Sequence, residues 1–188
     1  MERPVRTARD PGGDSRTNAI AGGAIAGFIG GVAIIAWMGI ITAAQGGDLW
    51  APLKMAAFPF LGDRALLPGF DPVALFASTI VHFLVSVGWG VLFGIATYGL
   101  SRPVTLLASV PFGIVVWLVM FYIVLPLVGA RELLAMVSPA LAAAEHLVFG
   151  LFTAIGFLPF QREVVLRAPA PEPGREPGPA PAGPAPAV

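Results

Sequence analysis

Four long stretches of this sequence are almost free of charged residues. The only charged side chains inside them are Arg16, at the edge of the first stretch, and Glu145, in the last. The stretches cover residues 15–47, 72–101, 103–130 and 133–161. A helix needs about 20 apolar residues to cross a bilayer, and it satisfies its backbone hydrogen bonds within its own segment. We therefore predict transmembrane helices near residues 19–45, 73–99, 103–128 and 139–160.

The composition indicates the same class of protein. Hydrophobic residues make up 56% of the chain and charged residues 12%, against about 25% charged residues in a soluble domain. This leaves too little polar surface to cover a water-soluble globule, and the apolar runs are too long and uniform for the strands of a membrane barrel. The predicted fold is an all-α four-transmembrane-helix bundle, and its first partner is the lipid bilayer.

Two counts exclude further classes. The net charge is zero, which argues against nucleic acid as a partner, because phosphate binding requires a basic excess. The chain has no cysteine, so disulfides, thiolate metal sites and cysteine nucleophiles are excluded. The serines and threonines of the spans lack the setting of a nucleophile elbow. We therefore expect that the protein is not an enzyme.

The predicted domains are a disordered leader over 1–17, a transmembrane domain over 18–165 and a disordered proline-rich tail over 166–188. Residues 168–188 contain eight prolines, six alanines and three glycines, a composition that cannot form a core. The connection over 46–72 has apolar residues at helical spacing from Trp50 onward. It predicts a short interfacial helix with Trp50 at headgroup depth; an apolar loop packed over the bundle is the alternative.

Basic residues are distributed unequally between the two sides of the predicted bundle. One side has three, Lys54, Arg64 and Arg131, and the side with both termini and Arg102 has eight. Loops rich in Lys and Arg stay in the cytoplasm. We therefore expect both termini to be cytoplasmic.

Small residues recur at four-residue spacing in all four predicted helices. Such stripes let helix backbones approach closely, which favours association in lipid. The stripes contain Gly23, Gly27 and Gly31; Ser86, Gly90 and Gly94; Ser109 and Gly113; and Ala142, Gly150 and Ala154.

Three ionisable residues, His82, Glu145 and His146, lie within the predicted spans. Such residues are costly in lipid and usually face the protein interior. Each histidine precedes a small-residue stripe on a helix of the same direction, at nearly the same predicted depth. We therefore expect a duplicated hairpin, with the two imidazoles facing each other. The residues expected to support them are Trp37, Tyr122, Glu145, Ser86 and Gly150.

Four interpretations of the histidine pair remain open. His82 and His146 could bind a haem b iron axially, or hold a divalent metal together with Glu145. The adjacent Glu145 and His146 point about 100° apart on a helix, which weakens the three-ligand site. A proton path through His and Glu is the third interpretation. In the fourth, each histidine forms a structural hydrogen bond between helices.

Three short segments carry a resemblance to a known family. They are Thr79–His82 through Ser86, Leu125–Gly129, and Glu145–Val148. Over about residues 20–165 the chain resembles the YagU-like inner-membrane proteins of bacteria, four-helix proteins without an established chemistry. The resemblance implies a bacterial inner (plasma) membrane location and marks His82 and His146. Some members carry a further histidine in the third helix, where this chain has Met120-Phe121-Tyr122.

These observations favour a multi-pass accessory or structural membrane protein with an interior histidine pair, with a homo-oligomer or a membrane complex as its expected assembly. The alternatives are a cofactor-bearing subunit for electron or proton transfer, with haem b or a metal at His82 and His146, and a small transporter. The spans show no interrupted helix with convergent charges of the kind that transporters use.

Overall fold

The computed structural model describes residues 11–161, with side chains from Arg16 onward, and these residues form helices, turns and bends. Four of the described helices are long and apolar enough to cross a membrane. They are Arg16–Ala44, Pro72–Thr97, Arg102–Leu127 and Pro139–Phe160. The prediction of an all-helical chain with four such helices is confirmed, and the predicted tail over 166–188 lies outside the described residues.

The long helices are α1 (Pro11–Ala44), α4 (Pro72–Thr97), α5 (Arg102–Val119) and α8 (Pro139–Phe157). Four short helices connect or extend them, α2 (Trp50–Lys54), α3 (Phe58–Leu61), α6 (Leu125–Leu127) and α7 (Leu133–Met136). Single helical turns cover Met55–Ala57, Gly62–Leu66, Met120–Val124 and Leu158–Phe160. Helix α1 begins at Pro11, eight residues before the predicted start at 19, because a helix can continue past its apolar span.

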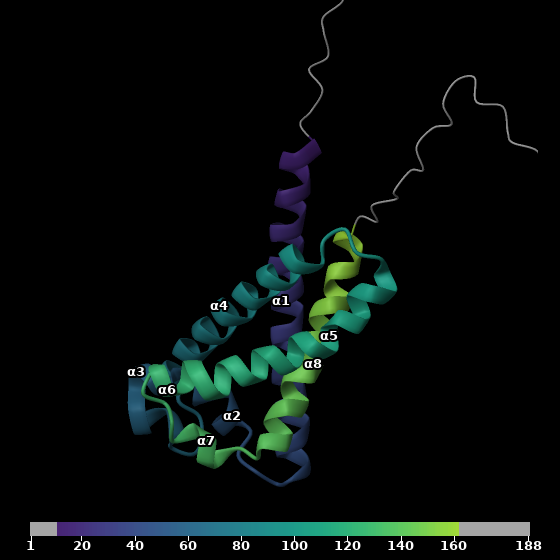
Figure 1. Cartoon of the computed structure of the whole chain (residues 1–188). Coiled ribbons are helices and arrows are strands. Elements are labelled where there is room, and N and C mark those ends of the chain that lie inside the picture. Colours follow the sequence, from purple (N-terminus) through teal and green to yellow (C-terminus); the bar gives the residue numbers. More distant parts are fainter. Residues whose placement is uncertain (1–10, 162–188) are drawn as a thin grey trace, which may run out of the picture.

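Helix α1 lies at the centre of the bundle (Figure 1). It packs against α4 on one side and α8 on another, and α5 packs against α8. One end of the bundle, here called the terminal end, carries the start of α1, the turn at 98–101 and Gln161. The opposite end, here called the connection end, carries the segments 45–71 and 128–138.

The two hairpins α1–α4 and α5–α8 pack through the same type of contact. A Cβ atom added to Gly90 would collide with the Gly23 carbonyl and the Gly27 backbone. A Cβ atom added to Gly150 would meet the corresponding atoms of Ser109 and Gly113. Because small residues allow this approach, each hairpin closes backbone against backbone. Gly94 makes the same type of contact with Ala19 and Gly23, one turn further along α4.

The two contacts between the hairpins differ. Helices α1 and α8 come close because Gly30 and Gly156 leave room for side chains of the facing helix. Between α4 and α5 the corresponding space holds aromatic rings, and Phe112 packs against Trp89 and Phe93 with centroids 6.2 Å and 4.8 Å away. The bulk of these rings keeps the backbones of α4 and α5 apart.

The last part of the third span is distorted. A π-helical turn covers Met120–Val124 and is followed directly by Pro126 in α6. Proline has no N–H, and its ring collides with the carbonyl four residues earlier, here that of Tyr122. A widened turn relieves this conflict, so Pro126 accounts for the distortion.

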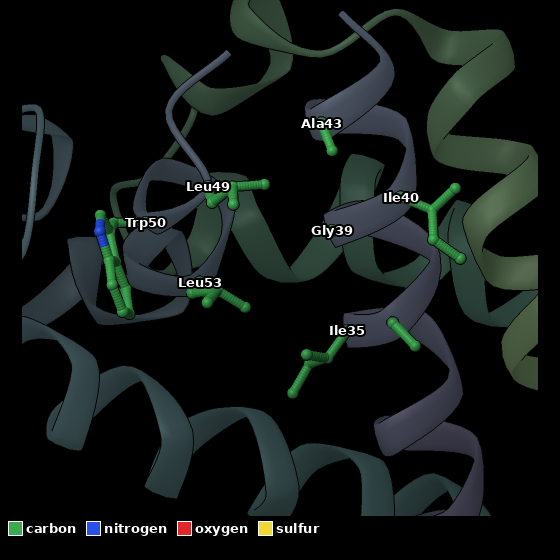
Figure 2. A pocket seen from close by; sticks show the side chains of 8 residues that line it. Ile35, Gly39, Ile40, Ala43, Leu49, Trp50 and Leu53 are labelled. Atoms are coloured by element: carbon green, nitrogen blue, oxygen red, sulfur yellow. The ribbon is translucent and has the colours of Figure 1, made fainter. Parts of the chain in front are cut away.

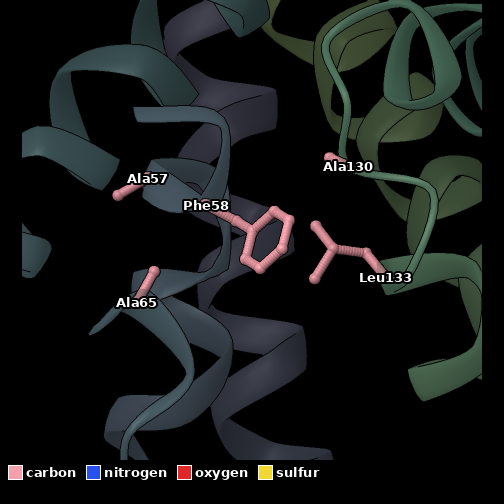
Figure 3. Close-up of a cluster of buried hydrophobic side chains, with 5 residues drawn as sticks. All are labelled: Ala57, Phe58, Ala65, Ala130 and Leu133. Carbon is pink, nitrogen blue, oxygen red and sulfur yellow. The ribbon is translucent and has the colours of Figure 1, made fainter. Parts of the chain in front are cut away.

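A small hydrophobic cluster joins the two connection-end segments. It contains Ala57, Phe58 and Ala65 from the first segment and Ala130 and Leu133 from the second. The Phe58 ring points toward Leu133 across the gap between them (Figure 3). The segment over 46–71 contains short helices. Through this cluster, one face of it packs against the segment over 128–138.

Polar contacts fix the same segment. Lys54 is fully buried, and its Nζ donates to the carbonyl oxygens of Leu67 and Gly69, the second at 2.7 Å. Asp48 accepts from the backbone N–H of Gly69 at 2.7 Å and of Trp50 at 3.0 Å. These two N–H groups, that of Gly69 first, hold the pKa of the Asp48 carboxyl below its usual value. Lys54 and Asp48 thus hold the backbone around Gly69 from two sides.

Candidate functional site

His82 joins two helices. It lies half-buried on α4, and its Nε2 is 2.9 Å from the carbonyl oxygen of Gly31 on α1. Because a carbonyl oxygen only accepts, Nε2 carries the proton of this bond. A Cβ atom on Gly31 would meet the side chains of Ser86 and Phe83, which flank this contact. His82 thus forms an interhelical hydrogen bond of the kind that the sequence suggested.

His146 is bonded within its own helix. Its Nδ1 lies 2.8 Å from the carbonyl oxygen of Ala142, one turn earlier on α8. The Phe121 ring packs edge-on against the imidazole, with centroids 5.6 Å apart. In the neutral ring, Nδ1 is the protonated nitrogen and Nε2 keeps a free lone pair. Within the described residues no hydrogen bond to this Nε2 is seen, so this atom is available as an acceptor or ligand.

The two histidines differ in depth. His82 lies beside Gly31, whereas a Cβ atom on Gly30 would meet Thr153 of α8. His146 is seven residues before Thr153, and antiparallel packing places it level with Trp37, seven residues after Gly30. At 1.5 Å per residue the histidines are therefore about 9 Å apart along the α1 axis. This differs from the expected common depth.

The small-residue stripes that follow the two histidines resemble each other in sequence, but the histidines make different contacts. His82 bonds the backbone of α1, whereas His146 bonds its own helix.

Glu145 lies inside the bundle. Only 6% of its surface is exposed, and no hydrogen bond to its carboxyl is seen within residues 11–161. It occupies the same face of α8 as Phe149 and Thr153, which pack against Gly30 of α1. Glu145 therefore lies on the face of α8 that packs inside the bundle.

The residues expected to support the two histidines lie in different environments. Ser86 is buried against Gly27 and Gly31, and Gly150 is buried against Ser109 and Gly113, as their small size suggested. Trp37 is half-buried, with its Nε1 enclosed and without a partner among the described residues.

Tyr122 does not face the interior. Its surface is 57% exposed, and its ring packs edge-on against Trp117 rather than against a histidine. The expected role of Tyr122 as an interior partner is therefore corrected. The π-helical turn at Met120–Val124 contains this residue and changes the direction in which its side chain points.

The positions of His82 and His146 limit how they could hold a metal ion or a haem. Within residues 11–161, no three His, Cys, Asp or Glu side chains gather in a group that could hold a metal ion. Haem ligation by His82 through Nε2 would require breaking its bond to Gly31. His146 has the arrangement common among metal-ligating histidines, with one ring N–H bonded to a carbonyl and the other nitrogen free.

Two surface hollows lie away from the histidines. One is apolar and lies between the end of α1 and α2, where Ile35 and Leu53 point into the space between the helices (Figure 2). The other lies at the terminal end and is lined by Arg16, Ile20, Ile95 and Tyr98, with Ala19. Neither contains a cluster of ionisable side chains.

Sequence reasoning did not single out two polar contacts that the fold depends on. The sequence shows Lys54 only as a charge in a loop, and the path of that loop sets which carbonyls its ammonium binds. Gln161 donates from Nε2 to the carbonyls of Thr97 (2.9 Å) and Leu100 (2.7 Å) and to the Thr105 hydroxyl. Its one visible signal was its position as the first polar residue after an apolar run.

No protein-family model, curated protein or solved structure matches the chain.

Proposed function

We propose that this chain is a multi-pass protein of the bacterial inner membrane with a structural or accessory role. Its resemblance to YagU-like proteins implies the membrane location. The observation that carries the proposal is the bond from His82 Nε2 to the Gly31 carbonyl at 2.9 Å. Through this bond, the most conspicuous polar side chain of α4 joins two helices. The backbone contacts of both hairpins serve the same purpose.

The proposed orientation has both termini in the cytoplasm. Arg16 and Arg102 lie at the terminal end, whereas Lys54, Arg64 and Arg131 belong to the connection-end segments. The positive-inside rule then favours a cytoplasmic terminal end. Exposed Trp50, in α2 and 40% accessible, suits a position at the opposite membrane interface.

Enzyme fusions test the orientation. Alkaline phosphatase fused after Gly69 should be active, because it folds outside the cytoplasm, and the same fusion after Arg167 should be inactive. The reverse pattern would overturn the proposed orientation. A cytoplasmic reporter fused at the same two positions serves as the control, since its activity should follow the opposite pattern.

A cofactor-bearing subunit for electron or proton transfer is the second candidate, and the free Nε2 of His146 is the observation that favours it. Haem b or a metal would then bind with this atom as a ligand, accompanied by rearrangement of His82. Absorption spectra and elemental analysis of the purified protein separate the two candidates. A haem band lost in both His82→Ala and His146→Ala would replace the structural proposal. A band lost only in His146→Ala would assign the cofactor to His146 alone.

A further inference from the structure

The hollow at the terminal end is lined by polar and apolar residues one helical turn apart. On α1, Arg16 precedes Ile20 by four residues, and on α4, Tyr98 follows Ile95 by three. Residues at these spacings share one face of a helix. Each helix therefore presents its polar residue at the end of the bundle and its isoleucine about 5 Å deeper. The lining of the hollow thus changes from polar to apolar over one turn.

Close packing of α1 and α4 forms the inner side of this hollow. Ala19 is buried and lines it, and a Cβ atom on Gly94 would collide with the Ala19 carbonyl. The walls are more open, since Ile20 is 49% exposed and Ile95 is 56% exposed. The hollow has a volume of about 480 Å³, within the range of about 300–1,000 Å³ that is usual for small-ligand sites. It is a depression with a fixed inner side and walls that reach the lipid-facing surface.

Arg16 gives the hollow a positive charge that no described carboxylate neutralises. It is exposed and forms no ion pair within residues 16–161. The carboxylates of that range lie in the half of the bundle toward the connection end. They are Asp48, Asp63, Asp71, Glu132 and Glu145. The charge of the hollow therefore favours an anion.

The depth of the hollow narrows the kind of anion. Arg16 begins the first candidate membrane span, and Tyr98 directly follows the second, which ends at Thr97. Tyrosine is enriched at the level of the lipid headgroups, and arginine keeps its charged group at that level while its stem lies along apolar surface. A matching ligand carries negative charge at this level and an apolar chain one turn deeper. A phospholipid has both parts, whereas a soluble anion lacks the second.

We propose that this hollow binds one anionic phospholipid, with the lipid phosphate on the Arg16 guanidinium and an acyl chain between Ile20 and Ile95. A guanidinium binds two phosphate oxygens through parallel N–H bonds. A zwitterionic headgroup also carries a cation, for which the described lining offers no carboxylate. The site goes beyond a structural role, and it rests on the proposed orientation only for the leaflet that supplies the lipid.

Native mass spectrometry of the full chain in detergent micelles tests the charged half of the site. Titrations with phosphatidylglycerol and with phosphatidylcholine of the same acyl chains compare the two headgroups. The wild-type protein should bind the anionic lipid about fivefold more tightly, the contribution of one basic residue at an anionic surface. Arg16→Gln should abolish this preference. Arg102→Gln, which removes an exposed cation of the terminal end that does not line the hollow, should keep it.

A second pair of variants tests the apolar half. Ile95→Trp places a larger side chain in the hollow without changing its charge, so it should weaken binding of phosphatidylglycerol to the level of Arg16→Gln. Ile40→Trp is the matched control, because Ile40 lines the hollow between α1 and α2, and it should leave the affinity unchanged. Glycerol phosphate, the headgroup without acyl chains, should not displace the lipid at equal concentration. Should Ile95→Trp fail to fold, Ile20→Trp tests the opposite wall.

Each outcome decides part of the proposal. Equal affinities of the wild-type protein for the two lipids, or equal losses in Arg16→Gln and Arg102→Gln, would overturn the anionic site. An unchanged affinity in Ile95→Trp, or displacement by glycerol phosphate, would show that charge alone attracts the lipid and would overturn the acyl-chain site. Because a micelle has no inner and outer side, none of these results depends on the orientation, which the enzyme fusions test separately.

Discussion

Gly90 and Gly27 meet backbone to backbone across the α1–α4 contact. A Cβ atom on Gly90 would overlap the Cα and N atoms of Gly27, whereas a Cβ atom on Gly88, half a turn away, would meet nothing within 4 Å. The two glycines of α4 therefore differ in environment while sharing the same helix. This difference allows the role of close packing to be measured separately from helix propensity.

Gly90→Ala should destabilise the bundle by about 1–3 kcal/mol, since backbone atoms must move to admit the methyl group. Gly88→Ala should be neutral or stabilising by up to about 1 kcal/mol, because alanine is the better helix former. Unfolding in mixed micelles, followed by circular dichroism, measures both. Equal effects of the two substitutions would show that α1 and α4 do not pack in this register.

His82→Ala should lower the free energy of unfolding by about 0.6 kcal/mol, the average for interhelical hydrogen bonds in membranes. The reason is the loss of the bond to the Gly31 carbonyl. His146→Ala is the matched comparison, because His146 bonds within its own helix and its loss separates no helices. The same micelle unfolding assay applies, and a larger effect of His146→Ala would indicate that His146 carries the contact between helices.

Much of the fold followed from the sequence because the bilayer restricts what an apolar run can form. The predicted span at 139–160 has the same bounds as the observed one, Pro139–Phe160. The small-residue stripes also identified the faces on which Gly90 and Gly150 lie. The four-residue spacing of small residues shows which face of a helix is packed, because one small residue in each turn marks that face.

Register and side-chain direction did not follow from the sequence. His82 and His146 head similar stripes, but His82 bonds the Gly31 carbonyl of a neighbouring helix and His146 bonds Ala142 within its own helix. The expectation for Tyr122 rests on its depth along the third helix, which does not fix the direction of a side chain, and Tyr122 lies in the π-helical turn before Pro126. Contacts between distant segments, such as Lys54 with Leu67, depend on a loop path that no local pattern encodes.

Asp71 predicts a pH dependence at the start of α4. Its carboxylate accepts from Arg64 Nε at 2.8 Å and caps the helix through the N–H groups of Val73 and Ala74. The Arg64 guanidinium, first, and these N–H groups lower the pKa of Asp71 to about 2. A lowered pKa means that the charged form is stabilised in the folded protein. The stabilisation is complete above the ordinary value of 3.8 and is lost as the pH falls to about 2.

Asp71→Asn tests this dependence, because asparagine still caps a helix but does not titrate. Between pH 4 and pH 2 the thermal midpoint of the wild-type protein should fall by more than that of Asp71→Asn. The difference between the two midpoints should be smallest at about pH 2. Raised salt should reduce the difference at neutral pH, since the pair is exposed. Parallel curves over this range would contradict the assigned ion pair.

Lys54 predicts the stability of the connection end. Lys54→Met keeps most of the side-chain volume but removes the ammonium, leaving the Leu67 and Gly69 carbonyls without their donor. Hydrogen bonds to charged groups contribute about 1.5–3 kcal/mol, so local opening of residues 62–70 should increase at least tenfold. The backbone N–H of Gly69 donates to the Asp48 carboxylate at 2.7 Å. Hydrogen exchange at this amide therefore reports the opening directly. Arg131→Met, at an exposed position of the neighbouring segment, is the matched control and should leave the exchange rate unchanged; an equal rise in both variants would mean that Lys54 acts only through its charge.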